Sequence, residues 1–113
     1  MVEIKSIHQD DICTLVVIGE VDASSSIHLD QSISDASRKC AKLLVDCSQL
    51  EYISSAGLGV FMSYINDLEE KNIQMVIFGM SEKVKHVFQI LGLDQLLKIA
   101  ETAEEAKAVF NGV

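Results

Sequence analysis

Two apolar runs at the start of the chain predict a β-hairpin. Residues 2–7 alternate loosely between apolar and polar and are typical of an edge strand, whereas residues 12–18 form a nearly continuous apolar run. The short length and β-branched content of the second run favour a buried strand over a helix. Asp10 and Asp11 lie between the two runs and favour a turn, so we expect the two strands to pair.

Four stretches repeat apolar residues at the spacing of an amphipathic helix, the first from about Ser24 to Lys39. Ser81 and Thr102 are expected to cap the third and fourth helices, and Glu105 completes a capping box with Thr102. Gly92 is expected to end the third helix in a left-handed conformation. The residues expected on the four buried faces are Ile27, Leu29, Ile33, Ala36 and Cys40; Leu58, Phe61, Met62, Ile65 and Leu68; Val84, Val87, Phe88 and Leu91; and Ala103, Ala106, Val109 and Phe110.

Short apolar runs between these helices predict further strands at residues 42–46, 73–78 and 96–99. Strands that alternate with helices after an opening hairpin predict a mixed, mainly parallel sheet. The 113 residues contain no Gly/Ser-rich linker, so residues 1–113 are expected to form one domain. The predicted fold is α/β, with about four to five strands and about four helices.

The chain is acidic, with a formal net charge of −8. An acidic surface repels the phosphates of nucleic acids and of anionic membranes, so we expect neither as a partner. A basic patch on another protein suits this charge better. No apolar stretch reaches the roughly 20 residues needed to cross a bilayer, and the first residues do not resemble a signal peptide. We therefore expect a soluble, cytoplasmic protein.

The cysteines predict neither a disulfide framework nor a metal site. Cys13, Cys40 and Cys47 are odd in number, have no Cys-x-x-Cys spacing, and have no histidine at ligand spacing. We expect three reduced, mostly buried thiols. No metal and no cofactor is expected.

The segment with the clearest functional chemistry is residues 52–59, which read Tyr-Ile-Ser-Ser-Ala-Gly-Leu-Gly. Ser54 and Ser55 lie where the second helix begins, and the free N–H groups and positive dipole of a helix start suit a phosphate. Gly57 and Gly59 each cost a helix about 1 kcal/mol relative to alanine, and small residues allow another chain to approach closely. In a simpler interpretation the serines cap the helix and the glycines serve internal packing.

Residues 52–59 resemble the phosphorylation signature of bacterial anti-sigma-factor antagonists, the founding members of the STAS domain family. Residues 19–22, Gly-Glu-Val-Asp, resemble the second landmark of that family at the expected spacing. By position, the resemblance makes Ser55 the phosphorylated serine. Ser54 stands where many members carry aspartate, which makes it the second candidate.

The resemblance implies a protein that binds a partner and is not an enzyme. The unphosphorylated form is expected to bind an anti-sigma factor that is also a serine kinase, which releases the sigma factor. Phosphorylation at Ser55 reverses the binding, and a metal-dependent serine phosphatase resets the protein. The implied partner-binding residues are Asp22, Ser24, Ser54, Ser55, Ala56, Gly57 and Gly59. Asp22 fits equally well as the acidic cap of the first helix.

Three alternatives remain open from the sequence. An enzyme with a serine nucleophile needs a neighbouring base, but His8, His28 and His86 are far apart in the chain and no Gly-x-Ser-x-Gly motif is present. The second alternative is a STAS module with another role, which regulates a phosphatase, a transport system or a signalling complex, or binds a small ligand. The third is a vestigial serine, with constitutive binding to the partner.

Overall fold

Strands and helices follow one another in the order that the sequence predicts. The structure is a computed structural model and describes residues 2–111. The strands are β1 (Val2–Gln9), β2 (Ile12–Val21), β3 (Lys42–Ile53), β4 (Gln74–Phe78) and β5 (Lys98–Ala100). The helices are α1 (Ser26–Lys39), α2 (Ser55–Glu70), α3 (Glu82–Ile90), the short 3-10 helix η1 (Leu93–Gln95) and α4 (Ala103–Phe110). Among the described residues, no helix has both the length and the hydropathy to cross a membrane.

The five strands form one sheet in the order β1-β2-β3-β4-β5. β1 pairs antiparallel with β2, and every later pair is parallel. The α/β class and the mixed, mainly parallel sheet are therefore confirmed. Asp10 turns the hairpin with a positive φ of 58°, which aspartate tolerates better than most residues do.

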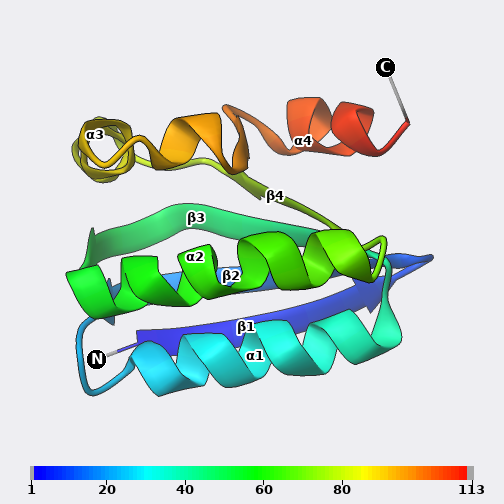
Figure 1. Cartoon of the computed structure of the whole chain (residues 1–113), viewed down its shortest axis with the longest axis horizontal. Coiled ribbons are helices and arrows are strands. Elements are labelled where there is room, and N and C mark those ends of the chain that lie inside the picture. The colour runs from blue at the N-terminus through cyan, green and yellow to red at the C-terminus, as the bar shows by residue number, and fades with distance from the viewer. Residues whose placement is uncertain (1, 112–113) are drawn as a thin grey trace.

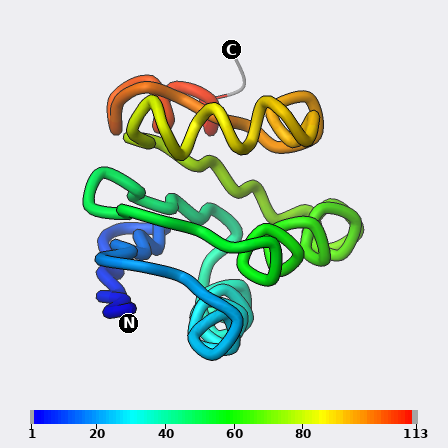
Figure 2. The backbone as a smooth tube through the Cα atoms, turned by 90° about the vertical axis from the view of Figure 1, so that its left-hand side faces the viewer, coloured from blue at the N-terminus to red at the C-terminus, as the bar shows by residue number. Residues whose placement is uncertain are grey.

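Helices cover both faces of this sheet. On one face, alternate strand residues such as Leu15, Val45 and Ile77 pack with residues of α1, α2 and α3 in a single core. Figure 1 shows α1 and α2 lying along the strands, and Figure 2 shows the same two helices end-on beside the sheet. On the other face, a smaller core that includes Leu44 and Phe110 packs α4 against β3 and β4.

The helix ends follow the predicted chemistry with one change. The Ser81 hydroxyl accepts a hydrogen bond from Val84 N at 3.2 Å, and Gly92 adopts the left-handed conformation expected of it. The Thr102 hydroxyl accepts from Glu105 N at 3.2 Å. The Glu105 carboxylate accepts from the N–H of Glu101 at 3.1 Å, one residue before the cap and not at the cap itself.

The prediction that the third strand ends at residue 46 was wrong. β3 continues to Ile53, because β2 goes on pairing with it after β4 has ended opposite Asp46. Register shifts interrupt this second half, so its buried residues are Cys47, Leu50 and Ile53 and do not alternate. The last strand also begins later than predicted, at Lys98.

Three apolar residues assigned to the core are exposed: Ile27 at 58%, Met62 at 50% and Leu91 at 55%. α1 begins at Ser26, two residues later than predicted, so Ile27 lies in its first turn and faces away from the buried side. α3 ends at Ile90, so Leu91 follows the helix and does not continue its buried face. Ile27 and Met62 lie on the helices that cover one face of the sheet.

The prediction of three reduced thiols was wrong for two of them. Cys13 at the start of β2 and Cys40 at the end of α1 form a disulfide, with their Cα atoms 6.0 Å apart. Cys47 is a free, buried thiol, as predicted, and burial raises its pKa to about 12. The fold joins two cysteines that are 27 residues apart in the sequence.

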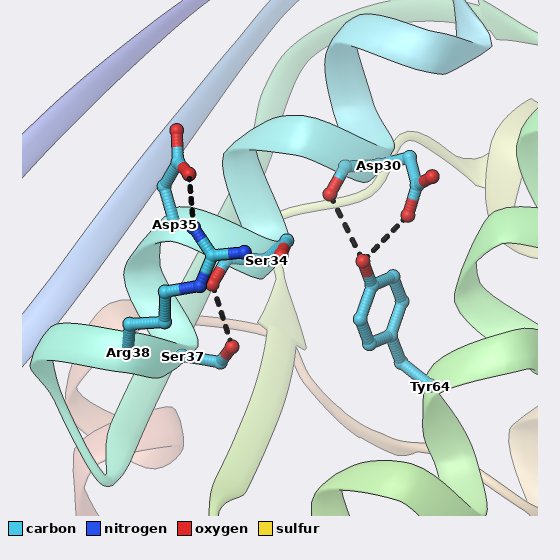
Figure 3. A network of polar contacts seen from close by, with 6 residues as sticks. All are labelled: Asp30, Ser34, Asp35, Ser37, Arg38 and Tyr64. Carbon is cyan, nitrogen blue, oxygen red and sulfur yellow. Dashed lines mark hydrogen bonds and ion pairs between the residues drawn. The ribbon is translucent and has the colours of Figure 1, made fainter.

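A polar contact fixes α1 against α2 (Figure 3). The Tyr64 hydroxyl of α2 lies 3.0 Å from the Asp30 carbonyl oxygen and 2.5 Å from its Oδ1. Partial burial is the larger cause, and the contact with the Asp30 carboxylate the next, of a rise in the pKa of Tyr64 to about 12. The tyrosine therefore stays a hydrogen-bond donor at neutral pH and holds the two helices in one relative position.

Candidate functional site at the ends of β2 and β3

The carboxyl ends of β2 and β3 lie side by side and bring two sequence motifs together. Val21 pairs with Ile53 in the parallel ladder, and the backbone N–H of Ser54 donates to the Val21 carbonyl oxygen at 2.8 Å. Gly19 has a φ of 97° next to a register shift, a conformation that only glycine adopts at low cost. The segments that follow the two strands, residues 22–25 and 54–59, are called the serine site below.

Asp22 organises the first half of the serine site. Its Oδ1 accepts hydrogen bonds from the N–H groups of Ser24 at 3.0 Å and Ser25 at 2.9 Å. The hydroxyls of the same two serines lie 2.8 and 2.9 Å from it. Asp22 thus stabilises the turn that precedes α1, but it is not the cap of that helix, because Ser25 occupies the N-cap position. A contact between Asp22 and a partner stays a prediction.

Ser25 belongs to this turn and was missed by the sequence reasoning. It is only 6% exposed, and its hydroxyl oxygen accepts from Asp22 N at 2.9 Å. Ser24, in contrast, is exposed. A run of three serines after an aspartate signals a turn, but it does not say which hydroxyl is buried.

The hydrogen bonds from Ser24 and Ser25 lower the pKa of Asp22 to about 2, from an ordinary value of 3.8. A lowered folded-state pKa stabilises the fold above the ordinary value, and this stabilisation disappears as the pH falls toward 2. We expect Asp22→Asn to lose less free energy of unfolding than the wild type between pH 5 and pH 2. Urea unfolding at a series of pH values measures this, and parallel curves for the two proteins would contradict it.

The structure distinguishes Ser54 from Ser55. Ser54 is the N-cap of α2, is partly buried, and accepts a hydrogen bond from Gly57 N at 3.4 Å through its hydroxyl. Ser55 is the first residue of α2 and is exposed. Within residues 2–111, no hydrogen bond involves the Ser55 hydroxyl. Its hydroxyl is therefore free to reach a second protein, whereas that of Ser54 is engaged.

The two glycines of the serine site differ in their surroundings. A Cβ atom on Gly57 would lie 2.7 Å from Ile53 Cγ1 and 2.8 Å from Val21 Cγ1, both in buried side chains. Gly57 therefore lets the first turn of α2 rest on the ends of β2 and β3. Gly59 is exposed and has no atom within 4 Å of such a Cβ. Only Gly59 offers an open surface to another chain.

Comparison with known proteins agrees with this geometry. Residues 3–106 match the STAS domain. The chain belongs to the STAS domain family. It is 30% identical over 105 residues to the anti-sigma-B factor antagonist of Listeria monocytogenes, which covers 92% of this chain and 91% of that protein. The resemblance drawn from the two sequence motifs is thereby confirmed.

Solved structures show the same fold. An anti-sigma factor antagonist from Mycobacterium paratuberculosis matches this STAS domain with a TM-score of 0.84 at 19% identity, over 96% of this chain and 93% of that one. The unphosphorylated form of the anti-sigma factor antagonist SpoIIAA matches with a TM-score of 0.73 at 18% identity, over 100% of both chains. Its phosphorylated form, from Bacillus, matches with 0.70 at 20% identity, over 97% and 99%.

Three exposed apolar side chains lie on the elements that frame the serine site of this STAS domain. They are Ile27 in the first turn of α1, Tyr52 near the end of β3, and Met62 in α2. Figure 1 shows that α1 and α2 begin at the same end of the sheet. The helical period did not predict the exposure of Ile27 and Met62, because both fall near the buried stripe of their helices.

The histidines do not complete a catalytic arrangement with the serines. Among residues 2–111, no hydrogen bond joins Ser54 or Ser55 to His8, His28 or His86, and all three imidazoles are exposed. His28 lies beside a shallow hollow that Asp22, Ser24 and Ser25 also line. Among the described residues, the Ser55 hydroxyl thus has no hydrogen-bonded histidine of the kind that activates a serine nucleophile.

Proposed function

We propose that this STAS domain is an anti-sigma-factor antagonist whose binding is switched off by phosphorylation of Ser55. The observation that carries the proposal is the exposed Ser55 hydroxyl, free of hydrogen bonds, beside a Ser54 that is engaged as a cap. Relatives that are named anti-sigma-B factor antagonists support it along nearly the whole chain. The protein binds a partner and catalyses no reaction itself.

The unphosphorylated form binds an anti-sigma factor with serine kinase activity and so frees the sigma factor. That kinase phosphorylates Ser55, the complex dissociates, and a metal-dependent serine phosphatase restores the first form. This cycle takes place in the bacterial cytoplasm and needs no nucleic acid or membrane contact by this chain. A net charge of −8 favours a basic surface on the kinase.

The partner contacts the exposed part of the serine site. Asp22, Ser24, Ser54, Ser55, Ala56 and Gly59 all have some solvent exposure there. Gly57 is buried and does not contact the partner. It contributes indirectly, by letting α2 start close to the sheet. Ile27 and Met62 add exposed apolar area on the neighbouring helices, of the kind that anchors protein interfaces.

Release requires no refolding of the antagonist. A phosphate adds about −1.5 to −2 charges, and the start of α2 tolerates them because its first N–H groups and dipole favour an anion. The same charge becomes unfavourable when the partner covers it and removes its water without supplying a cation. The conflict therefore arises at the interface and not within the domain.

The test is capture from a lysate of the source bacterium with three baits: the wild type, Ser55→Glu, and Ser63→Glu as a charge control. Ser63 is exposed on the same helix and lies outside the serine site. We expect the wild type and Ser63→Glu to capture an ATP-dependent serine kinase that phosphorylates Ser55, and Ser55→Glu to lose it. Equal capture by all three baits would mean that Ser55 is vestigial, and a captured transporter or phosphatase without a kinase would indicate another STAS role.

A further inference from the structure

Three side chains with metal-binding atoms meet at the end of β2 that is remote from the serine site. His8 on β1 lies directly opposite Cys13 on β2 in the antiparallel hairpin. Cys40 follows the last residue of α1 and brings its sulfur to the same place. One ligand atom from each residue lies within 4.8 Å of the other two.

We propose that His8, Cys13 and Cys40 bind one transition-metal ion, with Zn²⁺ as the expected occupant, when the two cysteines are reduced. Two thiolates and an imidazole form a donor set that zinc prefers. Because a Zn–S bond is about 2.3 Å long, two atoms bound to one zinc ion lie within about 4.6 Å of each other. The ligand atoms of the three residues lie within 4.8 Å of one another, so they meet that condition once reduction lets the two sulfurs separate and the imidazole moves slightly closer.

The environment suits a bound ion that remains reachable from solvent. Cys13 is 1% exposed and Cys40 is 6% exposed, so the two sulfurs form the inner side of the site. The His8 side chain is exposed and forms its outer side. Three protein ligands leave a fourth position for water or for a group from another molecule.

The disulfide and the metal site are alternative states of the same two cysteines. A thiol reductant opens the Cys13–Cys40 bond by exchange: two reductant thiols become one disulfide, and their two hydrogens end on Cys13 and Cys40. Metal binding then replaces both thiol protons, because the ligands are thiolates. Sequence spacing does not indicate this site, because Cys13 and Cys40 are 27 positions apart and His8 comes from a third segment.

The test uses Co²⁺ as a spectroscopic probe, on protein without a histidine tag, reduced and kept free of oxygen. We expect one equivalent to produce thiolate-to-cobalt charge-transfer bands and the visible bands of a four-coordinate ion, and Zn²⁺ to abolish both. Each of the single variants Cys13→Ser and Cys40→Ser should either lose the charge-transfer bands or retain about half of their intensity. A variant that retains them should bind cobalt at least 10-fold more weakly than the wild type. His8→Ala should weaken binding at least 10-fold.

Cys47→Ala is the matched control, because Cys47 is a buried thiol outside this cluster, and it should bind cobalt as the wild type does. Oxidised wild type, shown to be folded by circular dichroism, should bind none. The proposal is overturned if reduced and oxidised wild type bind cobalt equally, or if His8→Ala binds as tightly as the wild type. A loss of binding in Cys47→Ala, with its fold intact, would overturn the assignment of ligands as well.

Discussion

Replacing Ser55 with glutamate is expected to weaken binding to the anti-sigma factor about 100-fold or more. Each tenfold loss of affinity requires about 1.4 kcal/mol, and an uncompensated charge buried in an interface costs several kcal/mol. Ser55 is exposed in the free protein, so the substitution leaves the fold intact and acts only when the partner covers it. Isothermal titration calorimetry with the purified anti-sigma factor measures the change in Kd.

Two further variants separate the two serines. Ser55→Ala should bind the anti-sigma factor within about threefold of the wild type, since a small neutral side chain adds no charge, but it should accept no phosphate. Ser54→Ala should lose about 1 kcal/mol of stability with its cap, yet still be phosphorylated. Mass spectrometry after incubation with ATP and the kinase of the proposed cycle identifies the phosphorylated residue. If the Ser55→Ala variant were phosphorylated at Ser54, the switch would be assigned to Ser54.

The order of elements could be predicted because each strand and helix has its own apolar pattern. The strand formed by residues 47–53 could not be predicted, because the second half of β3 pairs with β2 across register shifts and its buried residues follow no fixed period. The exposure of Ile27, Met62 and Leu91 was also not predicted. A helical period locates an apolar stripe, but only packing decides which residue at its margin is covered.

The serine site was partly predictable for a similar reason. The motifs placed Asp22 after the second strand and Ser54 and Ser55 at the start of the second helix. The structure brings these positions together because β3 continues beside β2 as far as Ile53. Which serine is engaged as a cap depends on one hydrogen bond, from Gly57 N to the Ser54 hydroxyl, and spacing does not encode it. The Cys13–Cys40 pair depends wholly on the fold, because the packing of α1 on the sheet brings Cys40 next to β2.

Gly57→Val is expected to destabilise the domain by about 3 kcal/mol, at the upper end for an overpacked core. Even the Cβ of a new side chain would lie under 3 Å from Ile53 and Val21, and both of these are buried in the main core. The start of α2 must then move away from the sheet. A loss of this size corresponds to a fall in Tm of at least about 10 °C, which differential scanning calorimetry measures directly.

The same substitution two residues later provides the control. A Cβ on Gly59 meets no atom within 4 Å, so Gly59→Val should change stability by less than about 1 kcal/mol. If both variants lowered the Tm equally, helix propensity and not packing would explain the loss at Gly57. Because Ser54 N donates to the Val21 carbonyl oxygen at 2.8 Å, a displaced α2 also shifts Ser54 and Ser55 relative to Asp22. Gly57→Val should therefore bind the anti-sigma factor more weakly even at temperatures where it remains folded, which ties the close packing of this glycine to the geometry of the serine site.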